Sequence, residues 1–151
     1  MKKDEGKYPR AKVFGILQSG HRLLVEEFEG EHSKGRGFYY RPIGGSIEYG
    51  EKSTEALSRE FNEELKETVE IEDFLGFIEN IFYINDRIGH EIILIYNVSF
   101  VDKENYTREM FTIQESEQVS FAKWIDVMDF VTGKKVLFPD GLVDKLERGI
   151  S

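Results

Sequence analysis

Three glutamates, Glu60, Glu63 and Glu64, follow a glycine-rich segment and crowd together in an amphipathic stretch. On a helix, residues three and four positions apart share a face, so these carboxylates gather along one side. Like charges at that spacing destabilise a helix by a few tenths of a kcal/mol per pair. A hard divalent cation reverses this penalty, because Mg²⁺ selects oxygen ligands. The cluster therefore predicts a cation site, with a solvated acidic helix face as the alternative.

The residues around the start of this helix favour the cation site over the solvated face. Gly44 and Gly45 have no side chain, so the backbone there can come close to a ligand. Glu51 and Arg59 lie around the same predicted helix start. We therefore expect the glycine turn and the acidic helix to form one site, in which Gly44 lies against the substrate.

The same segment partly matches a phosphate-binding P-loop, GxxxxGK[ST]. Gly45 is followed by four residues and then by Gly50, but Glu51 separates that glycine from Lys52 and Ser53. A carboxylate in the loop would repel the phosphate that the backbone N–H groups should bind. We therefore reject the P-loop interpretation.

Short strands before this segment must position it. Residues 11–18 and 23–28 predict a β-hairpin. Residues 29–37 are polar and glycine-rich, which predicts a mobile loop. A short aromatic strand follows at residues 38–40, and Pro42 is expected to break regular pairing.

The predicted helix begins at Ser53 or Thr54, either of which can cap it. Its buried stripe comes from apolar residues at helical spacing: Ala56, Leu57, Phe61 and Leu65. Later residues predict strands at 69–84, 91–101 and 119–124 and helices at 125–131 and 139–148. Strands outnumber helices but are separated by them, which predicts an α/β fold in which helices cover a mixed sheet.

Composition limits the function. The chain has 151 residues and a net charge of −9, so a single domain is expected and binding to a nucleic-acid polymer is disfavoured. It has no cysteine, no apolar run long enough to cross a bilayer and no signal-peptide pattern near its N-terminus. We expect a cytoplasmic protein with no membrane partner. A small anionic substrate is compatible with the charge if something local and positive offsets it.

Gly45, Glu51 and the run Arg59-Glu60-Phe61-Asn62-Glu63-Glu64 together resemble the Nudix box, GX5EX7REUXEEXGU, where U is a bulky apolar residue. The spacing agrees throughout this part, including the apolar position at Phe61. The chain departs from the box at its end, where Lys66 and Glu67 replace the glycine and the apolar residue. The departure concerns the turn after the helix and leaves the carboxylates unchanged.

The resemblance to the Nudix (MutT-like) hydrolases implies a fold and an activity. The fold is an α/β/α sandwich with a mixed β-sheet between helices, here a single domain over residues 11–151 after an N-terminal tail of residues 1–10. The activity is hydrolysis of a pyrophosphate bond with Mg²⁺ or Mn²⁺. The substrate is a nucleoside diphosphate linked to another group, such as ADP-ribose, or a nucleoside triphosphate. A non-catalytic nucleotide sensor on the same fold is the alternative, and a homodimer is a further option.

The resemblance also implies residue roles. Glu60 and Glu64 are the first metal ligands, with Glu63 beside them, and Gly45 lends its backbone carbonyl to the metal. One of the carboxylates, or another outside the box, acts on the attacking water. Glu51 and Arg59 correspond to the pair that positions a metal-binding carboxylate.

Residues outside the box complete the predicted site. Glu91 opens a strand after a turn, and it is either an additional metal ligand or a strand-edge glutamate facing water. Arg41 is placed to meet a substrate phosphate with its guanidinium fork. Tyr39, Tyr40 and Phe82 have rings that could stack on a base, but aromatic residues at strand spacing more often belong to the core, which is our expectation here.

Overall fold

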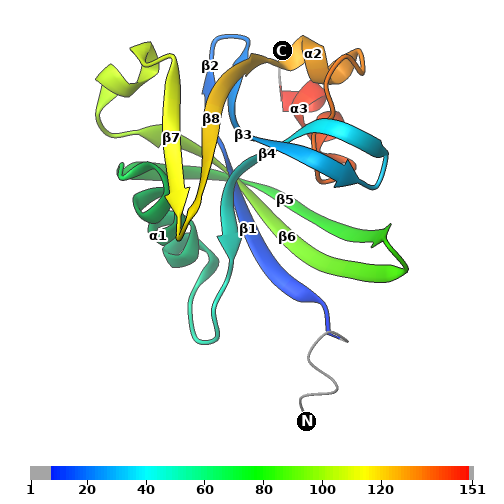
Figure 1. Ribbon diagram of the computed structural model, residues 1–151. Coiled ribbons are helices and arrows are strands. Elements are labelled where there is room, and N and C mark those ends of the chain that lie inside the picture. The colour runs from blue at the N-terminus through cyan, green and yellow to red at the C-terminus, as the bar shows by residue number, and fades with distance from the viewer. Residues whose placement is uncertain (1–7, 150–151) are drawn as a thin grey trace.

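A computed structural model describes residues 8–149 of the chain (Figure 1). Within this range the strands form one eight-stranded sheet in the order β5-β6-β1-β4-β3-β8-β7, with the short β2 paired to β3. Strands β1 and β6 run parallel and the other neighbouring strands run antiparallel, so the sheet is mixed. The strands are β1 Arg10–Ile16, β2 Gln18–Ser19, β3 Arg22–His32, β4 Gly35–Ser46, β5 Val69–Ile84, β6 Arg87–Phe100, β7 Met110–Glu115 and β8 Gln118–Asp126.

Strand β4 belongs to both halves of the sheet. Its first part pairs with β3 up to Pro42, which lies opposite Val25, and its second part pairs with β1 from Ile43 onward. Pairing with β3 therefore ends at Pro42, as expected, but the strand continues by pairing with β1. A residue without an N–H fits at this point, because the strand leaves one neighbour for the other there.

The predicted mobile loop at residues 29–37 is wrong, because this segment is the end of a β-hairpin. Strand β3 continues to His32 and β4 begins at Gly35, with Glu31 opposite Arg36. Arg36 donates to the Glu31 carboxylate at 3.0 Å, and the rings of Phe28 and Tyr39 stack with centroids 5.2 Å apart. These cross-strand contacts stabilise strands that the local composition disfavours.

Helix α1 spans Ser53–Leu65. Its N-cap is Lys52, whose backbone N–H donates to the Glu55 carboxylate at 2.8 Å. The expected side-chain cap from Ser53 or Thr54 is wrong, since the Ser53 hydroxyl is hydrogen-bonded to Tyr96 at 2.7 Å instead. The predicted buried stripe is confirmed: Ala56, Leu57, Phe61 and Leu65 are all buried.

The helix ends at Lys66, in the position where the Nudix box has glycine. Lys66 adopts the left-handed conformation with φ of 59°, and its backbone N–H donates to the Asn62 carbonyl at 3.1 Å. Its ammonium group donates to the Glu63 carbonyl at 2.7 Å. Lys66 therefore adopts the left-handed conformation that glycine would favour. This conformation costs a non-glycine residue about 1 kcal/mol.

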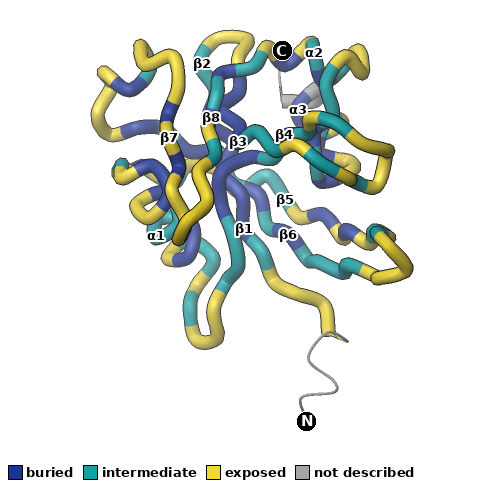
Figure 2. Tube along the Cα trace, in the orientation of Figure 1, coloured by how far each residue is buried: buried dark blue, intermediate teal, exposed yellow. Residues whose placement is uncertain are grey.

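Helices cover both faces of the sheet, which confirms the α/β/α sandwich. One core cluster packs α1 against the sheet through residues such as Leu57, Phe61 and Ile43. A second cluster packs α2, Val127–Val131, and α3, Leu142–Gly149, against the opposite face (Figures 1 and 2). The first cluster holds α1 against the strands that carry the glycine turn.

Several boundaries differ from the sequence prediction. β5 is confirmed over Val69–Ile84, but β6 begins at Arg87 because the turn consists of Asn85 and Asp86, both with positive φ. The C-terminal helices begin later than predicted, because β8 continues to Asp126 and a turn from Pro139 to Leu142 precedes α3. β7 and the 3-10 helix η2, Lys103–Thr107, were not predicted.

No helix within residues 8–149 is both long and apolar enough to cross a membrane. The predicted tail of residues 1–10 lies mainly outside the described range, and β1 begins at its last residue, Arg10.

Candidate active site

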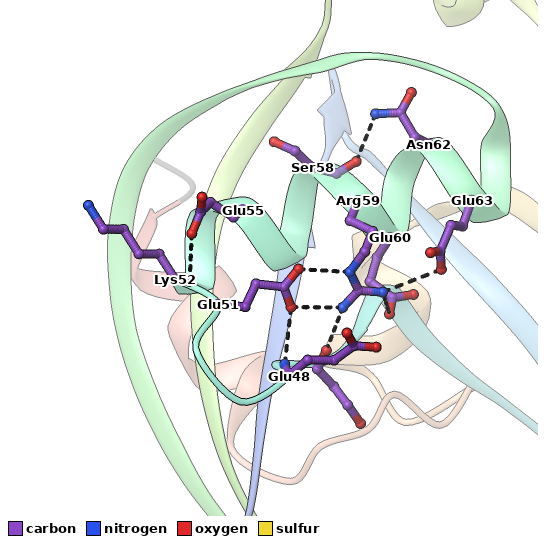
Figure 3. Close-up of polar contacts among 10 residues, drawn as sticks. Glu48, Glu51, Lys52, Glu55, Ser58, Arg59, Glu60, Asn62 and Glu63 are labelled. Atoms are coloured by element: carbon purple, nitrogen blue, oxygen red, sulfur yellow. Dashed lines mark hydrogen bonds and ion pairs between the residues drawn. The ribbon is translucent and has the colours of Figure 1, made fainter.

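An arginine on α1 ties the helix to the loop that precedes it (Figure 3). Arg59 donates from Nε to Oε2 of Glu51 at 2.8 Å and from Nη2 to Oε1 at 3.0 Å. The same Nη2 donates to the backbone carbonyl of Ser46 at 2.9 Å. The sequence prediction that Glu51 and Arg59 form a pair thus has a direct geometric counterpart.

Arg59 also contacts two of the predicted metal ligands. Its Nη1 donates to Glu60 at 3.0 Å and lies 3.4 Å from a Glu63 oxygen. Hydrogen bonds from Arg59 and then from the backbone N–H of Glu48 hold the pKa of Glu51 at about 2. Glu51 is therefore a permanent anion that holds the guanidinium between the loop and Glu60.

Gly45 lies directly against the Glu60 carboxylate. A Cβ atom at position 45 would come within 2.6 Å of the Glu60 carboxyl carbon, which is closer than real Cβ contacts. Glycine therefore leaves room for Glu60 in this position, and a larger residue would displace its carboxylate. Gly44, predicted to face the substrate, is buried instead, and a Cβ there would clash with the Val13 carbonyl and with Phe14 on β1.

Glu64 is a buried carboxyl with one oxygen that has no hydrogen-bond partner. Its side chain points into the protein with 6% of the residue exposed, and its Oε2 has no hydrogen bond. Burial and then the neighbouring carboxylates of Glu26, Glu60 and Glu115 together raise the pKa of Glu64 to about 10. A buried oxygen surrounded by like charges is missing a positive partner.

Glu26 and Glu115 belong to this acidic group and were missed from the sequence. Glu26 on β3 is only 6% exposed, accepts a hydrogen bond from the Ser120 hydroxyl at 2.6 Å, and has its pKa raised by burial. Glu115 ends β7. The alternation of β3 puts Glu26 on the same face as Leu24, which was a usable signal, but the run Leu23-Leu24-Val25 conceals that alternation.

The oxygens of this group suit a hard divalent cation. Among residues 8–149 no three acidic or histidine side chains are arranged as a ready metal cage. Glu60 is held by Arg59, whereas Glu64 has a free buried oxygen. The carboxylates of Glu26, Glu60, Glu64 and Glu115 influence one another, so a Mg²⁺ or Mn²⁺ ion would relieve their repulsion and supply the partner that Glu64 lacks. The donor set therefore fits the metal, with Glu63 exposed on the rim.

Glu91 is placed elsewhere. It lies on β6, 3.5 Å from the Lys12 ammonium, and accepts a hydrogen bond from the Asn80 amide at 3.3 Å. Among the described residues, no hydrogen bond or ion pair joins it to the carboxylates of α1. It borders a cavity of about 150 Å³ with Asn80, Arg41 and Phe82.

Arg41 borders two cavities in the protein surface. It borders the cavity of about 150 Å³ beside Glu91 and a second one of about 360 Å³ that Glu26, Glu115 and Ser120 also border. Its guanidinium carbon is 4.6 Å from the centre of the Phe28 ring. The predicted phosphate-binding side chain thus lies next to the acidic group and faces open space.

The aromatic residues divide between core and cavity. Tyr40 is 4% exposed and belongs to the core as expected, with its hydroxyl donating to Glu27 at 2.7 Å. Tyr39 and Phe82 are partly exposed and border the cavity of about 150 Å³, so the core assignment is wrong for these two.

Comparisons with known proteins identify the family and the fold. A model of the NUDIX domain family matches residues 7–146. A NUDIX hydrolase from Nitrosomonas europaea is 17% identical, with 93% of this chain and 87% of that chain covered and a TM-score of 0.64. A MutT NUDIX hydrolase from Burkholderia pseudomallei is 16% identical, with 95% and 99% covered and a TM-score of 0.65.

A third similar structure is an ADP-ribose pyrophosphatase from Streptococcus suis. It is 12% identical, with 95% of this chain and 94% of that chain covered and a TM-score of 0.59. No curated protein sequence matched the chain. At these identities the structures support the fold, and the family match covers nearly all of the described residues. The chain therefore belongs to the NUDIX domain family and is a Nudix hydrolase.

Proposed function

We propose that this protein hydrolyses a pyrophosphate bond in a nucleoside diphosphate linked to another group, using Mg²⁺ or Mn²⁺. The observation that carries the proposal is the buried, unpartnered Glu64 oxygen among the carboxylates of Glu26, Glu60 and Glu115. Such an arrangement disfavours the charged form of Glu64 unless a cation is bound, and its oxygens suit a hard cation. Nudix hydrolases act on small nucleotides, and the substrate classes that we propose are nucleotide sugars such as ADP-ribose and nucleoside triphosphates.

The proposed roles of the residues combine the family resemblance with their positions. Glu60 and Glu64 would hold the cation, with Glu63 at the rim, and the Gly45 carbonyl would complete the ligands as the resemblance implies. Arg59 positions Glu60, because it is itself held by both oxygens of Glu51. When bound, the cation supplies charge neutralisation for the pyrophosphate and lowers the pKa of a water molecule.

Binding of an anionic substrate to a chain with a net charge of −9 requires a local positive group. Arg41 borders both surface cavities, and the Phe28 ring below it fixes its guanidinium. We propose that Arg41 binds the substrate phosphate that lies farther from the carboxylates. The guanidinium presents paired N–H donors that match two phosphate oxygens.

A hydrolysis screen tests the proposed function. Purified protein with Mg²⁺ or Mn²⁺ is incubated with nucleotide sugars, dinucleoside polyphosphates and nucleoside triphosphates, and products are separated by chromatography. We expect cleavage of at least one class, and we expect Glu60→Gln and Glu64→Gln each to lower turnover by orders of magnitude while circular dichroism is unchanged. Glu70→Gln, at an exposed position near the start of β5, is the matched control and should keep the wild-type rate.

Two outcomes would contradict the proposal. Wild-type turnover in Glu60→Gln or Glu64→Gln would refute those roles. An absence of cleavage, combined with a clear nucleotide-dependent thermal shift, would establish the alternative of a nucleotide sensor on the same fold.

A homodimer is part of the proposal. Apolar side chains on the outer face of β5, Phe77 and Ile81, are 56% and 53% exposed, and a second copy would cover them. Light scattering at micromolar concentration tests this. A monomer mass would exclude the dimer and leave the hydrolytic proposal intact.

A further inference from the structure

A cavity of about 150 Å³ lies between the ends of two hairpins, on the β5–β6 side of Arg41. The β3–β4 hairpin contributes Tyr39, and the β5–β6 hairpin contributes Asn80, Phe82 and Glu91. Figure 1 shows the two hairpins projecting on the same side of the molecule. Pockets for whole drug-sized ligands occupy about 300–1,000 Å³, so this cavity has room for one ring system.

The walls of the cavity are aromatic. Tyr39 and Phe138 meet edge to face with centroids 5.8 Å apart, and Phe82 borders the same space from β5. Side chains alternate between the two faces of a strand, so Asn80 and Phe82 lie on the cavity face of β5. Ile81 and Tyr83 point to the other face. Aromatic walls offer flat π-faces on which a planar heterocycle can stack.

One side of the cavity is polar. Asn80 is 8% exposed and donates to Glu91, and Glu91 lies 3.5 Å from Lys12. The Asn80 amide keeps a carbonyl acceptor and a second N–H donor free for a ligand. Adjacent donor and acceptor groups are what the edge of a nucleobase presents, and asparagine pairs well with such an edge.

Arg41 links this cavity to the acidic group. It borders the aromatic cavity and also the larger cavity beside Glu26, Glu115 and Ser120. A ligand with its ring between the hairpins would place the next phosphate at Arg41 and direct the rest of the molecule toward Glu26 and Glu64.

We infer that the cavity bordered by Tyr39, Phe82, Phe138 and Asn80 binds the nucleobase of the substrate, with purines preferred over pyrimidines. This inference rests on the proposed function and deepens it, because it fixes the substrate as a nucleotide held by its base. Purines are preferred since their larger ring system covers more of the aromatic walls.

Nucleotide affinities measured in the absence of hydrolysis test the inference. Nuclear magnetic resonance titrations in EDTA compare AMP, GMP, CMP and UMP with ribose 5-phosphate, which has the sugar and phosphate but no base. We expect the purine nucleotides to bind at least tenfold more tightly than ribose 5-phosphate. Phe82→Ala should weaken AMP or GMP binding about tenfold, in line with the contribution of one stacked ring, and leave ribose 5-phosphate binding unchanged.

Controls separate this result from a general loss of structure. Tyr83→Ala removes an aromatic ring from the opposite face of the same strand and should change neither affinity. Phe82→Leu keeps apolar volume without a ring, and it replaces Phe82→Ala if that variant fails to fold. Asn80→Ala should reduce the difference in affinity among the four nucleotides.

The outcomes are distinct from those of the hydrolysis screen, because no cation or turnover is involved. Equal binding of ribose 5-phosphate and the purine nucleotides, or wild-type AMP and GMP affinity in folded Phe82→Ala and Phe82→Leu, would overturn the inference even in an active hydrolase. Base-dependent binding in a protein without turnover would support the base site and refute only the hydrolytic proposal.

Discussion

The guanidinium of Arg59 meets the carboxylate of Glu51 through two parallel hydrogen bonds, Nε to Oε2 at 2.8 Å and Nη2 to Oε1 at 3.0 Å. The remaining nitrogen, Nη1, is then directed to Glu60 at 3.0 Å. A planar fork with fixed donors can serve both carboxylates at once, whereas an ammonium group cannot. The pair thus determines where the Glu60 carboxylate lies.

Replacing the fork while keeping its charge tests this relationship. We expect Arg59→Lys to lower turnover at least tenfold, because a single ammonium cannot hold Glu51, Ser46 and Glu60 together. Steady-state kinetics measure the loss and circular dichroism checks the fold. Arg87→Lys, at the exposed first residue of β6, should keep the wild-type turnover. Equal turnover in wild type and Arg59→Lys would show that the fork does not position Glu60.

The contact between Gly45 and Glu60 gives a second prediction. In Gly45→Ala the new methyl group would overlap the Glu60 carboxyl group, so Glu60 must move. We expect a lower affinity for Mn²⁺ and a lower turnover, measured by calorimetry and kinetics. The double variant Gly45→Ala/Glu60→Asp shortens the colliding side chain and should recover the melting temperature without recovering turnover. An unchanged Mn²⁺ affinity in Gly45→Ala would contradict the packing.

The pKa of Glu64 predicts how stability depends on pH without metal. Its pKa is raised from 4.5 to about 10, so the folded protein keeps a proton that the unfolded chain releases above about pH 4.5. Folded protein then binds more protons than unfolded protein, and its stability falls as pH rises between these values, by up to about 1.4 kcal/mol per pH unit. Urea unfolding in EDTA at pH 5.5 and pH 8 measures the slope. Glu64→Gln should flatten it, and an unchanged slope in that variant would place the titrating group elsewhere.

Cation binding should release a proton for the same reason. At pH 7 the Glu64 carboxyl is protonated in the metal-free protein, and a carboxylate ligand must give up its proton to the solvent. We expect about one proton released per Mn²⁺ bound, measured by calorimetry in two buffers of different ionisation enthalpy. Glu64→Gln should remove most of this release. A binding enthalpy that is independent of buffer in the wild-type protein would refute the assignment of Glu64 as a ligand.

The sequence predicted those parts of the fold that depend on local pattern. The apolar stripe of α1 repeats every fourth residue from Leu57 through Phe61 to Leu65, and β5 is a long run of strand-forming residues, so both were found with nearly correct bounds. The hairpin end at residues 29–37 was missed because its stability comes from cross-strand contacts such as Phe28 with Tyr39. β7 was missed because only Phe111 and Ile113 carry its alternation in six residues.

The residues of the site were likewise predictable from the sequence only where they lie close together in the chain. Glu51, Arg59 and Glu60 lie close in the chain, and their contacts follow from helix geometry and the loop before it. The contribution of Glu26 depends on pairing between β3 and β8, which brings it to Ser120, and no local spacing encodes that contact. Glu91 was placed correctly on a strand, but the parallel pairing of β6 with β1 turns it toward Lys12.

The change of partners along β4 has an evolutionary consequence. One end of this strand supplies Tyr39 and Arg41 to the hairpin side, and the other end supplies Gly45 to the helix. Residues near the hairpin tips can therefore change during evolution and alter which substrates bind, while the acidic helix stays the same. Descendants of one ancestral protein can in this way take on new metabolic roles while they retain the same hydrolytic residues.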